Sequence, residues 1–196
     1  MRSIKIIIGL IFFTAICAFG FRMNSESKSA AVEINSELLV LDANKGLFLY
    51  EDLPFEGTAI SYSANGIQSE LANFSKGKRD GLLMKYFPDG SKSYEANYTT
   101  GLLEGKSYSW WSNGELRSES TYLNGVLHGV QKKWYQSGVL FKVTNLENGK
   151  EMGIQKAWRE NGKIYVNYEA KNGRIFGLQR ANLCYQLNDE TVTYED

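Results

Sequence analysis

The chain has 196 residues, with 22 basic and 22 acidic side chains, so its formal net charge at pH 7 is zero. A chain without surplus positive charge has no general attraction for nucleic acid, and we expect no nucleic-acid partner. Glycine is abundant, at 19 residues against 2 prolines, and 13% of the residues are aromatic, which predicts many tight turns between aromatic-rich strands.

Residues 1–21 have the pattern of an export signal. Arg2 and Lys5 precede an apolar run that ends at Phe21, and small residues stand near its end. This order is typical of a signal peptide, whereas an uncleaved membrane anchor needs about 17–25 apolar residues. Signal peptide, anchor and a lipidated Cys17 all remain open. Each predicts that the rest of the chain is exported to the periplasm or cell surface, with membrane contact only through this segment.

The next two segments precede the repetitive part of the chain. Residues 22–37 are polar and show no clear period, which predicts a spacer. Residues 38–56 contain two short apolar runs around an Asn/Gly turn at residues 43–46, which predicts an N-terminal capping hairpin. Beyond the export segment Cys184 is the only cysteine, so we expect no internal disulfide framework.

From residue 57 the sequence repeats strictly every 24 residues, which indicates an array of five tandem units at 57–177. The opening glycines of the units are Gly57, Gly81, Gly105, Gly129, Gly153 and Gly177. The glycines of a middle turn are Gly66, Gly90, Gly114, Gly138 and Gly162. The glycines of an outer turn are Gly77, Gly101, Gly125, Gly149 and Gly173. An aromatic column in the same register consists of Tyr62, Tyr86, Trp110, Trp134 and Trp158.

Each unit holds two strand-like segments joined by the middle turn. Serine, threonine, tyrosine and valine are frequent in them, and no 3.6-residue period is present. Pro88 suits the first central position of a type I turn, which predicts a three-residue turn with Gly90 left-handed. We therefore predict an all-β fold, an elongated single-layer antiparallel sheet of tandem β-hairpins. A helical signal or anchor segment precedes it, and residues 178–196 form a C-terminal cap.

The repeat unit resembles a known family. Its pattern is Gly-(x)4-Trp-(x)2-Asn-Gly, then Tyr-x-Asn-Gly-(x)3-Gly, as at Gly105–Gly129. This pattern resembles the variant MORN repeat, and the lead-in at residues 46–57 is similar to the start of YwqK-type bacterial proteins, commonly labelled toxin–antitoxin system antitoxins. The resemblance covers about residues 38–177. It implies an elongated sheet used for interaction or scaffolding, with membrane contact in some members, and it carries no catalytic residues.

The chain offers little for catalysis or metal binding. His128 is its only histidine, so a zinc site of the usual His/Cys type cannot be assembled, and no Gly-x-Ser-x-Gly motif is present. We expect a non-enzyme without cofactor or metal. The equivalent slots of other units hold Asp80, Glu104, Met152 and Phe176. The carboxylate pairs Asp80/Glu104 and Glu95/Glu119 could in principle serve a glycosidase, but carboxylates are mostly solvated surface residues.

Two interpretations remain for the aromatic residues. The aromatic column either packs over the hairpins or stacks against sugar rings, and regular occupancy in every unit favours packing. Trp111 stands outside the column next to Trp110, and strand alternation places it on the opposite face, so it is the candidate for ligand contact.

These observations support three hypotheses for the function. The first is a non-enzymatic exported repeat protein that presents an elongated β-surface to a protein partner. The second is a cell-envelope glycan-binding module that uses exposed aromatic residues. The third is an antitoxin that neutralises a co-encoded toxin.

Overall fold

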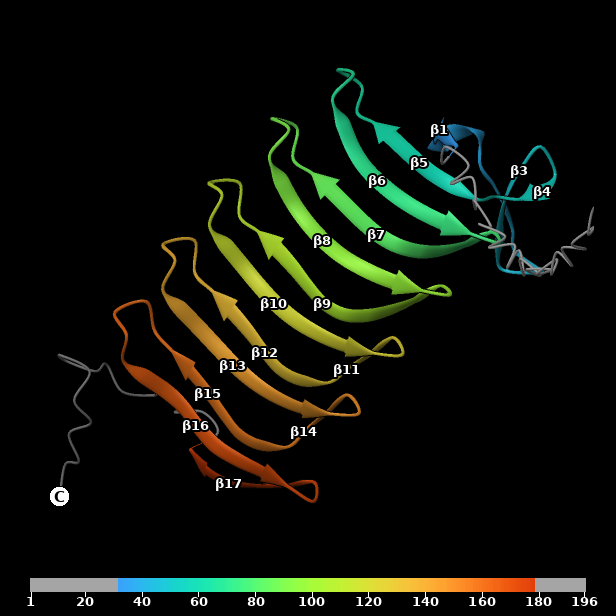
Figure 1. Ribbon diagram of the computed structural model, residues 1–196. Coiled ribbons are helices and arrows are strands. Elements are labelled where there is room, and N and C mark those ends of the chain that lie inside the picture. Colours follow the sequence, from blue (N-terminus) through green and yellow to red (C-terminus); the bar gives the residue numbers. More distant parts are fainter. Residues whose placement is uncertain (1–31, 179–196) are drawn as a thin grey trace, which may run out of the picture. The chain divides into compact units, whose positions relative to one another are not determined.

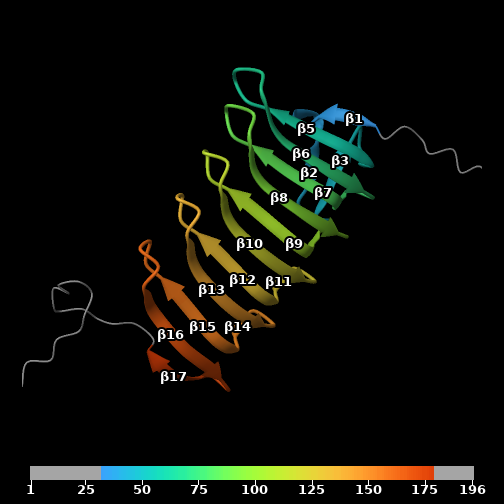
Figure 2. The same cartoon turned by 60° about the vertical axis from the view of Figure 1, so that its left-hand side comes forward.

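The computed structural model describes residues 32–178, and most of them form one large sheet in which consecutive hairpins lie side by side (Figures 1 and 2). The strands of the main sheet are β1 Glu33–Asn35, β5 Gly57–Tyr62, β6 Gln68–Ser75, β7 Lys78–Tyr86, β8 Lys92–Thr99, β9 Leu102–Trp110, β10 Leu116–Leu123, β11 Val126–Leu127, β12 Gly129–Trp134, β13 Leu140–Glu147, β14 Lys150–Glu151, β15 Gly153–Trp158, β16 Ile164–Lys171 and β17 Arg174–Leu178. All neighbours pair antiparallel except β1, which is parallel to β5. No α-helix occurs among these residues, and none of their helices is long and apolar enough to cross a membrane.

The pairing register repeats with the sequence period. The five repeat hairpins are β5–β6, β7–β8, β9–β10, β12–β13 and β15–β16. In each hairpin the opening glycine faces a larger residue on the second strand, as Gly81 faces Tyr98 and Gly105 faces Tyr122. A residue without a side chain leaves room for the ring across the strand pair. The predicted all-β sheet of antiparallel hairpins is confirmed.

The two kinds of turn differ in backbone conformation. In the middle turn after β7, Gly90 N–H donates to Phe87 O at 2.9 Å and Phe87 N–H to Ser91 O at 2.8 Å. Only Gly90 within this turn has positive φ, so the predicted three-residue turn is confirmed. In the outer turn after β10, both Asn124 and Gly125 have positive φ, the signature of a two-residue type I′ turn.

A second, three-stranded sheet packs against one face of the main sheet, here called the cap face. Its strands are β2 Val40–Asp42, β3 Leu47–Tyr50 and β4 Leu53–Pro54. The Phe48 ring on β3 lies 5.1 Å from the Phe74 ring on β6, and Phe55 lies 5.6 Å from Phe74. Burying the Phe55 and Phe74 side chains contributes about 1.5–3 kcal/mol each, and Phe48 is partly buried against them. The apolar core of the described residues therefore lies beneath this small sheet, around Ala59, Ala72 and Leu83.

The stretch 22–37, predicted as a spacer, differs from that prediction at its C-terminal end. Glu33–Asn35 form β1 and Ser36–Leu38 form the 3-10 turn η1. Thr58 N–H donates to Val32 O at 2.8 Å, so this segment covers the edge of β5. Backbone pairing does not depend on an apolar side-chain pattern, and an open strand edge favours a partner. A polar segment can therefore become a strand without a signal in its sequence.

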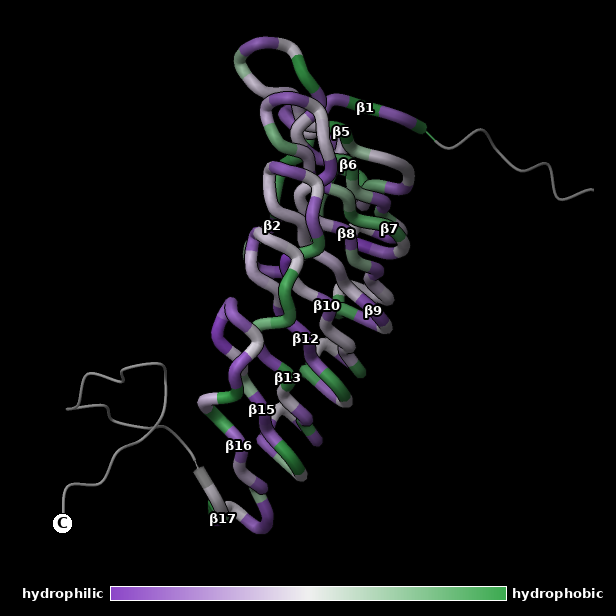
Figure 3. Tube along the Cα trace, turned by 90° about the vertical axis from the view of Figure 1, so that its left-hand side faces the viewer, coloured by the Kyte–Doolittle hydropathy of each residue, from purple (hydrophilic) through white to green (hydrophobic). Residues whose placement is uncertain are grey.

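Beyond the small sheet, the middle row of the cap face changes from apolar to polar. Neighbouring strands place Ala59, Ala72, Leu83 and Ala96 in one row, which continues with Ser107. Further along the array, Gln131 and Gln155 take the positions equivalent to Ser107, and both are buried. Figure 3 shows hydrophilic and hydrophobic residues interleaved along the strands. The buried side chains of the later repeats thus include polar residues, together with apolar ones such as Ala157.

The predictions for the two ends of the chain concern residues that lie almost entirely outside the described range. The signal or anchor segment at 1–21 lies outside the described residues, and the C-terminal cap predicted at 178–196 lies outside them except for Leu178, the last residue of β17.

Candidate functional site

A groove of about 380 Å³ lies between the third and fourth repeat hairpins, near their middle turns. It is lined by residues of β9 and β10 on one side and of β12 and β13 on the other, and this volume is within the usual range for ligand sites. The lining residues are Ser109, Trp111, Arg117, Ser118, Lys133, Trp134 and Phe141. We call this feature the interrepeat groove.

Two of its side chains come from irregular positions in the strand pairing. The register between β9 and β10 shifts from Leu116 to Ser118, which leaves Arg117 without a directly opposed residue. The register between β12 and β13 shifts likewise, so that Lys133 pairs with Lys142 and Phe141 is skipped. A bulge of this kind redirects the extra side chain. The bulges therefore add a guanidinium and an aromatic ring to the groove.

Trp111 lies in the groove, and its contacts are internal. Its indole Nε1–H donates to the main-chain oxygen of Trp134 at 3.2 Å, which links the third repeat to the fourth. The guanidinium carbon of Arg117 lies 4.7 Å from the Trp111 ring centre, within range of a cation–π contact. The side-chain N–H of Trp111 is therefore bonded to a neighbouring hairpin. The Trp111 ring orients the guanidinium of Arg117.

The groove carries positive charge without acidic partners. Lys133 pairs directly with Lys142, which places two ammonium-bearing side chains on the same face of neighbouring strands. Among residues 32–178, no ion pair includes Arg117, Lys133 or Lys142. The hydroxyls of Ser109 and Ser118 bond to each other at 2.6 Å at the floor of this surface. The arrangement can accept an anion that brings several oxygen atoms.

By strand alternation the side chains of the aromatic column lie on the other face of the sheet, and Trp134 offers its main-chain oxygen to Trp111 in the groove. The Trp110 ring lies 6.1 Å from the Tyr108 ring, and Lys92 Nζ lies 5.7 Å from the Trp110 ring centre. Tyr86 donates its hydroxyl to Met84 Sδ on the same strand at 3.5 Å. Tyr62 is 52% exposed. The remaining members are partly buried, and they are Tyr86, Trp110, Trp134 and Trp158. Trp111 and Trp110 therefore belong to different surfaces.

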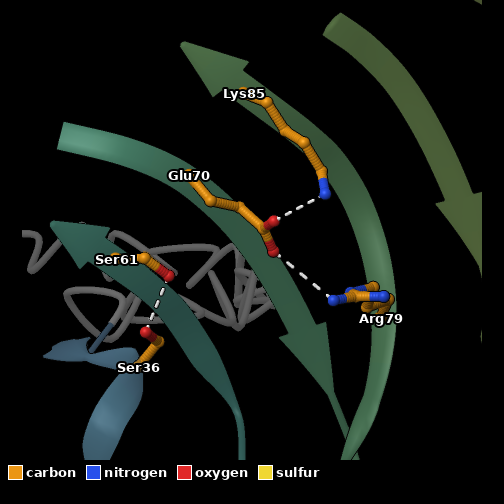
Figure 4. A network of polar contacts seen from close by, with 5 residues as sticks. All are labelled: Ser36, Ser61, Glu70, Arg79 and Lys85. Atoms are coloured by element: carbon orange, nitrogen blue, oxygen red, sulfur yellow. Dashed lines mark hydrogen bonds and ion pairs between the residues drawn. The ribbon is translucent and has the colours of Figure 1, made fainter. Parts of the chain in front are cut away.

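A second hollow, of about 290 Å³, lies beside the small sheet, and Arg79 in its lining makes internal contacts. Arg79 lies between two rings, with its guanidinium carbon 5.7 Å from the Phe48 ring centre and 5.9 Å from that of Tyr98. Figure 4 shows Glu70 reaching both Arg79 at 3.4 Å and Lys85 at 3.0 Å. Nearby, the Ser36 and Ser61 hydroxyls bond at 2.7 Å. These contacts attach the small sheet and η1 to the first two repeats.

The carboxylates weighed for catalysis have structural contacts. Asp80 accepts from the Thr100 N–H at 2.9 Å, and Glu104 accepts from the Asn124 N–H at 2.8 Å. Asp80 and Glu104 thus fasten the outer turns that follow β8 and β10. The ion pairs of the other two carboxylates are Glu95–Lys92 and Glu119–Lys106. Within residues 32–178, no group of three or more His, Cys, Asp and Glu side chains could hold a metal ion.

Sequence reasoning selected Trp111 but missed Arg117, Lys133 and Phe141. The repeat period identifies equivalent positions, whereas Arg117 and Phe141 enter the groove because the bulges skip them, and Lys133 faces Lys142 through the resulting register. The sequence did contain one signal for Arg117 and Phe141. A three-residue middle turn shifts the pairing register, so the residues that follow the turn no longer alternate regularly between the two faces of the sheet. Lys133 also carried a signal, since Lys132 and Lys133 must lie on opposite faces of one strand.

The comparisons with known proteins agree with the repeat geometry. Residues 103–124 and 127–150 match the family described as "MORN repeat variant". The comparison with curated proteins gives no match. The two matched segments contain the hairpins that enclose the interrepeat groove. These matches, in a part of the chain where the hairpin register recurs every 24 residues, show that residues 103–124 and 127–150 are similar to MORN-variant repeats.

Proposed function

We propose that the chain is a non-enzymatic repeat scaffold that binds a protein partner through the cap face of its third and fourth repeats. The observation that carries this proposal is the interrepeat groove, where Arg117 and Lys133 have no acidic partner among the described residues. Two like charges directly opposed across a strand pair are destabilising, so their presence favours a role in binding. MORN-type repeats as interaction modules support the same conclusion.

Glycan binding is the weaker alternative. Sugar rings stack on open aromatic faces, but Arg117 lies over Trp111, and the Phe141 ring lies 5.0 Å from the Tyr135 ring. Tyr135 in turn donates its hydroxyl to the Trp158 main-chain oxygen at 3.0 Å. The rings of this surface are engaged with each other and with the backbone. The groups that this surface presents to a ligand are the cationic side chains.

The same proposal includes where the protein acts and what kind of partner it binds. The basic and apolar pattern of residues 1–21 supports an exported scaffold that meets its partner outside the cytoplasm. Antitoxin activity is the special case in which the bound partner is a toxin. It adds the requirement that a neighbouring gene encode a toxic protein whose effect this chain suppresses.

Affinity purification with a variant series tests the proposal. The full-length protein, the double variant Arg117→Gln/Lys133→Gln and the control Lys132→Gln are used as bait in cell extracts, and retained proteins are quantified. Lys132 is the matched control because it pairs with Glu119 on the other face. We expect at least one protein to be retained by wild type and Lys132→Gln and lost with the double variant. Equal retention by all three, or none above background, contradicts the proposal.

A further inference from the structure

We propose that the interrepeat groove binds an extended acidic peptide segment of the partner, whose carboxylates contact Arg117, Lys133 and Lys142. This inference rests on the proposed function and adds the chemistry of the bound segment. The guanidinium is already oriented by its contact with the Trp111 ring at 4.7 Å. A planar guanidinium presents a fork of N–H groups that fits a carboxylate with two parallel hydrogen bonds.

The distribution of charge supports an acidic ligand. The whole chain is neutral, but the fourth repeat, residues 129–152, holds the four lysines 132, 133, 142 and 150 against the two glutamates 147 and 151. Of these lysines, Lys133 and Lys142 share the groove face. Glu115, an acidic residue of the neighbouring hairpin, lies against Gly138 in the next middle turn. The groove thus has a local positive surplus that an acidic ligand would neutralise.

The polar groups of the groove favour carboxylates over hydroxyl-rich ligands. The Trp111 N–H is bonded to Trp134 O, and the hydroxyls of Ser109 and Ser118 are bonded to each other. These contacts use the indole N–H and one of the two serine O–H groups, which leaves one neutral side-chain donor among these three residues. The cationic groups remain available, and their hydrogen bonds to carboxylates are stronger than those between neutral groups.

The size of the groove fits a short extended segment. It spans four neighbouring strands, β9, β10, β12 and β13, which is about 15 Å at the usual strand spacing. An extended peptide of about five residues covers that distance, and its alternate side chains point to one side about 7 Å apart. A segment with an acidic residue at every second position can direct two or three carboxylates into the groove.

Fluorescence anisotropy with a labelled peptide tests this inference. The probe is an alternating serine–glutamate peptide of about eight residues, and a serine–glutamine peptide of equal length is its neutral control. The proteins are wild type, Lys133→Gln, Arg117→Gln, Arg117→Lys and the control Lys132→Gln. We expect binding to wild type and Lys132→Gln, and binding about tenfold weaker or worse in the two glutamine variants of the groove. Arg117→Lys should fall between, because it keeps the charge and loses the fork.

Four outcomes overturn the inference. The first is that wild type binds no peptide at about 1 mM and low salt, and the second is that Lys133→Gln and Lys132→Gln weaken binding equally. The third is that the neutral peptide binds as tightly as the acidic one. The fourth is that an oligogalacturonate binds and the peptide does not. The last result assigns the groove to an acidic glycan. If the purification series still loses its partner with the groove variants while the peptide fails, the proposed function stands and only the ligand chemistry is wrong. Urea unfolding of each variant separates lost binding from lost folding.

Discussion

The side-chain amide of Gln155 bonds to both main-chain groups of Asn145. Its Oε1 accepts from the Asn145 N–H at 2.8 Å, and its Nε2 donates to the Asn145 carbonyl at 2.9 Å. Gln155 is completely buried. Its side chain supplies the acceptor for the Asn145 N–H where the array continues from β14 to β15, and it adds a second donor to the Asn145 carbonyl, which also accepts from the Met152 N–H. Gln131 makes the same two bonds to Thr121 one repeat earlier, at 3.1 and 3.4 Å.

Gln155→Leu should lower the free energy of unfolding by about 1–3 kcal/mol. The substitution leaves the partly buried Asn145 N–H without a partner, which costs about 1–3 kcal/mol, whereas the Asn145 carbonyl still accepts from the Met152 N–H at 3.0 Å. Urea unfolding followed by circular dichroism measures the change. Gln136→Leu is the control, because Gln136 is exposed and its change should stay within about 0.5 kcal/mol. Equal stabilities of the two variants would refute the role of the buried amide.

Stability should fall as the pH rises through the ionisation of Tyr168. Burial, together with the hydroxyl's hydrogen bond to Glu151 at 2.6 Å, raises the pKa of Tyr168 to about 12 from 10.0. The unfolded chain therefore loses this proton first, and the stabilisation present below pH 10 disappears between about pH 10 and 12. Near pH 11.5 we expect a loss of about 2 kcal/mol.

Tyr168→Phe isolates this contribution, because other tyrosines also titrate in the same range. The stability difference between wild type and Tyr168→Phe should shrink from about pH 8 to about pH 11.5 in urea unfolding series. A difference that stays constant with pH would show that Tyr168 titrates normally in the folded protein.

Arg79→Met should loosen the small sheet from the first repeats. Arg79 contacts both the Phe48 and Tyr98 rings, and methionine keeps the apolar packing while removing the charge. We expect a loss of about 1–2 kcal/mol, since the side chain is partly exposed and its ion pair with Glu70 is screened by solvent. Hydrogen exchange of the β3 amides should accelerate. The exposed neighbour Lys78, changed to methionine, should leave the exchange rates unchanged.

Lys133→Gln should raise the stability of the protein by about 0.2–1 kcal/mol, although it weakens binding. The substitution removes the repulsion between Lys133 and the directly opposed Lys142. Lys132→Gln should be neutral or slightly destabilising, because Lys132 faces Glu119. Thermal unfolding at low salt measures both. A Lys133→Gln variant that is less stable than wild type would show that the groove lysines serve the fold.

The repeat period was enough to predict the hairpins and the turn type, because glycine, asparagine and proline at fixed positions allow few backbone conformations. It did not predict β1, whose pairing with β5 uses only backbone groups of a polar segment. It also did not predict the groove. Arg117 and Phe141 enter it through skipped pairs, and Lys142 meets Lys133 only because of the register that results. Sequence spacing within a single strand does not by itself show which cross-strand pairs a bulge skips.

Site-specific photo-cross-linking tests the central claim that the partner binds on the groove face. A benzophenone amino acid replaces either Phe141, which lines the groove, or Tyr108, which lies on the opposite face, in the full-length protein in its native cells. We predict a cross-linked protein from position 141, its loss when Arg117→Gln is added, and none from position 108. Cross-linking from position 108 alone, or an undiminished yield from position 141 with Arg117→Gln, would contradict the account.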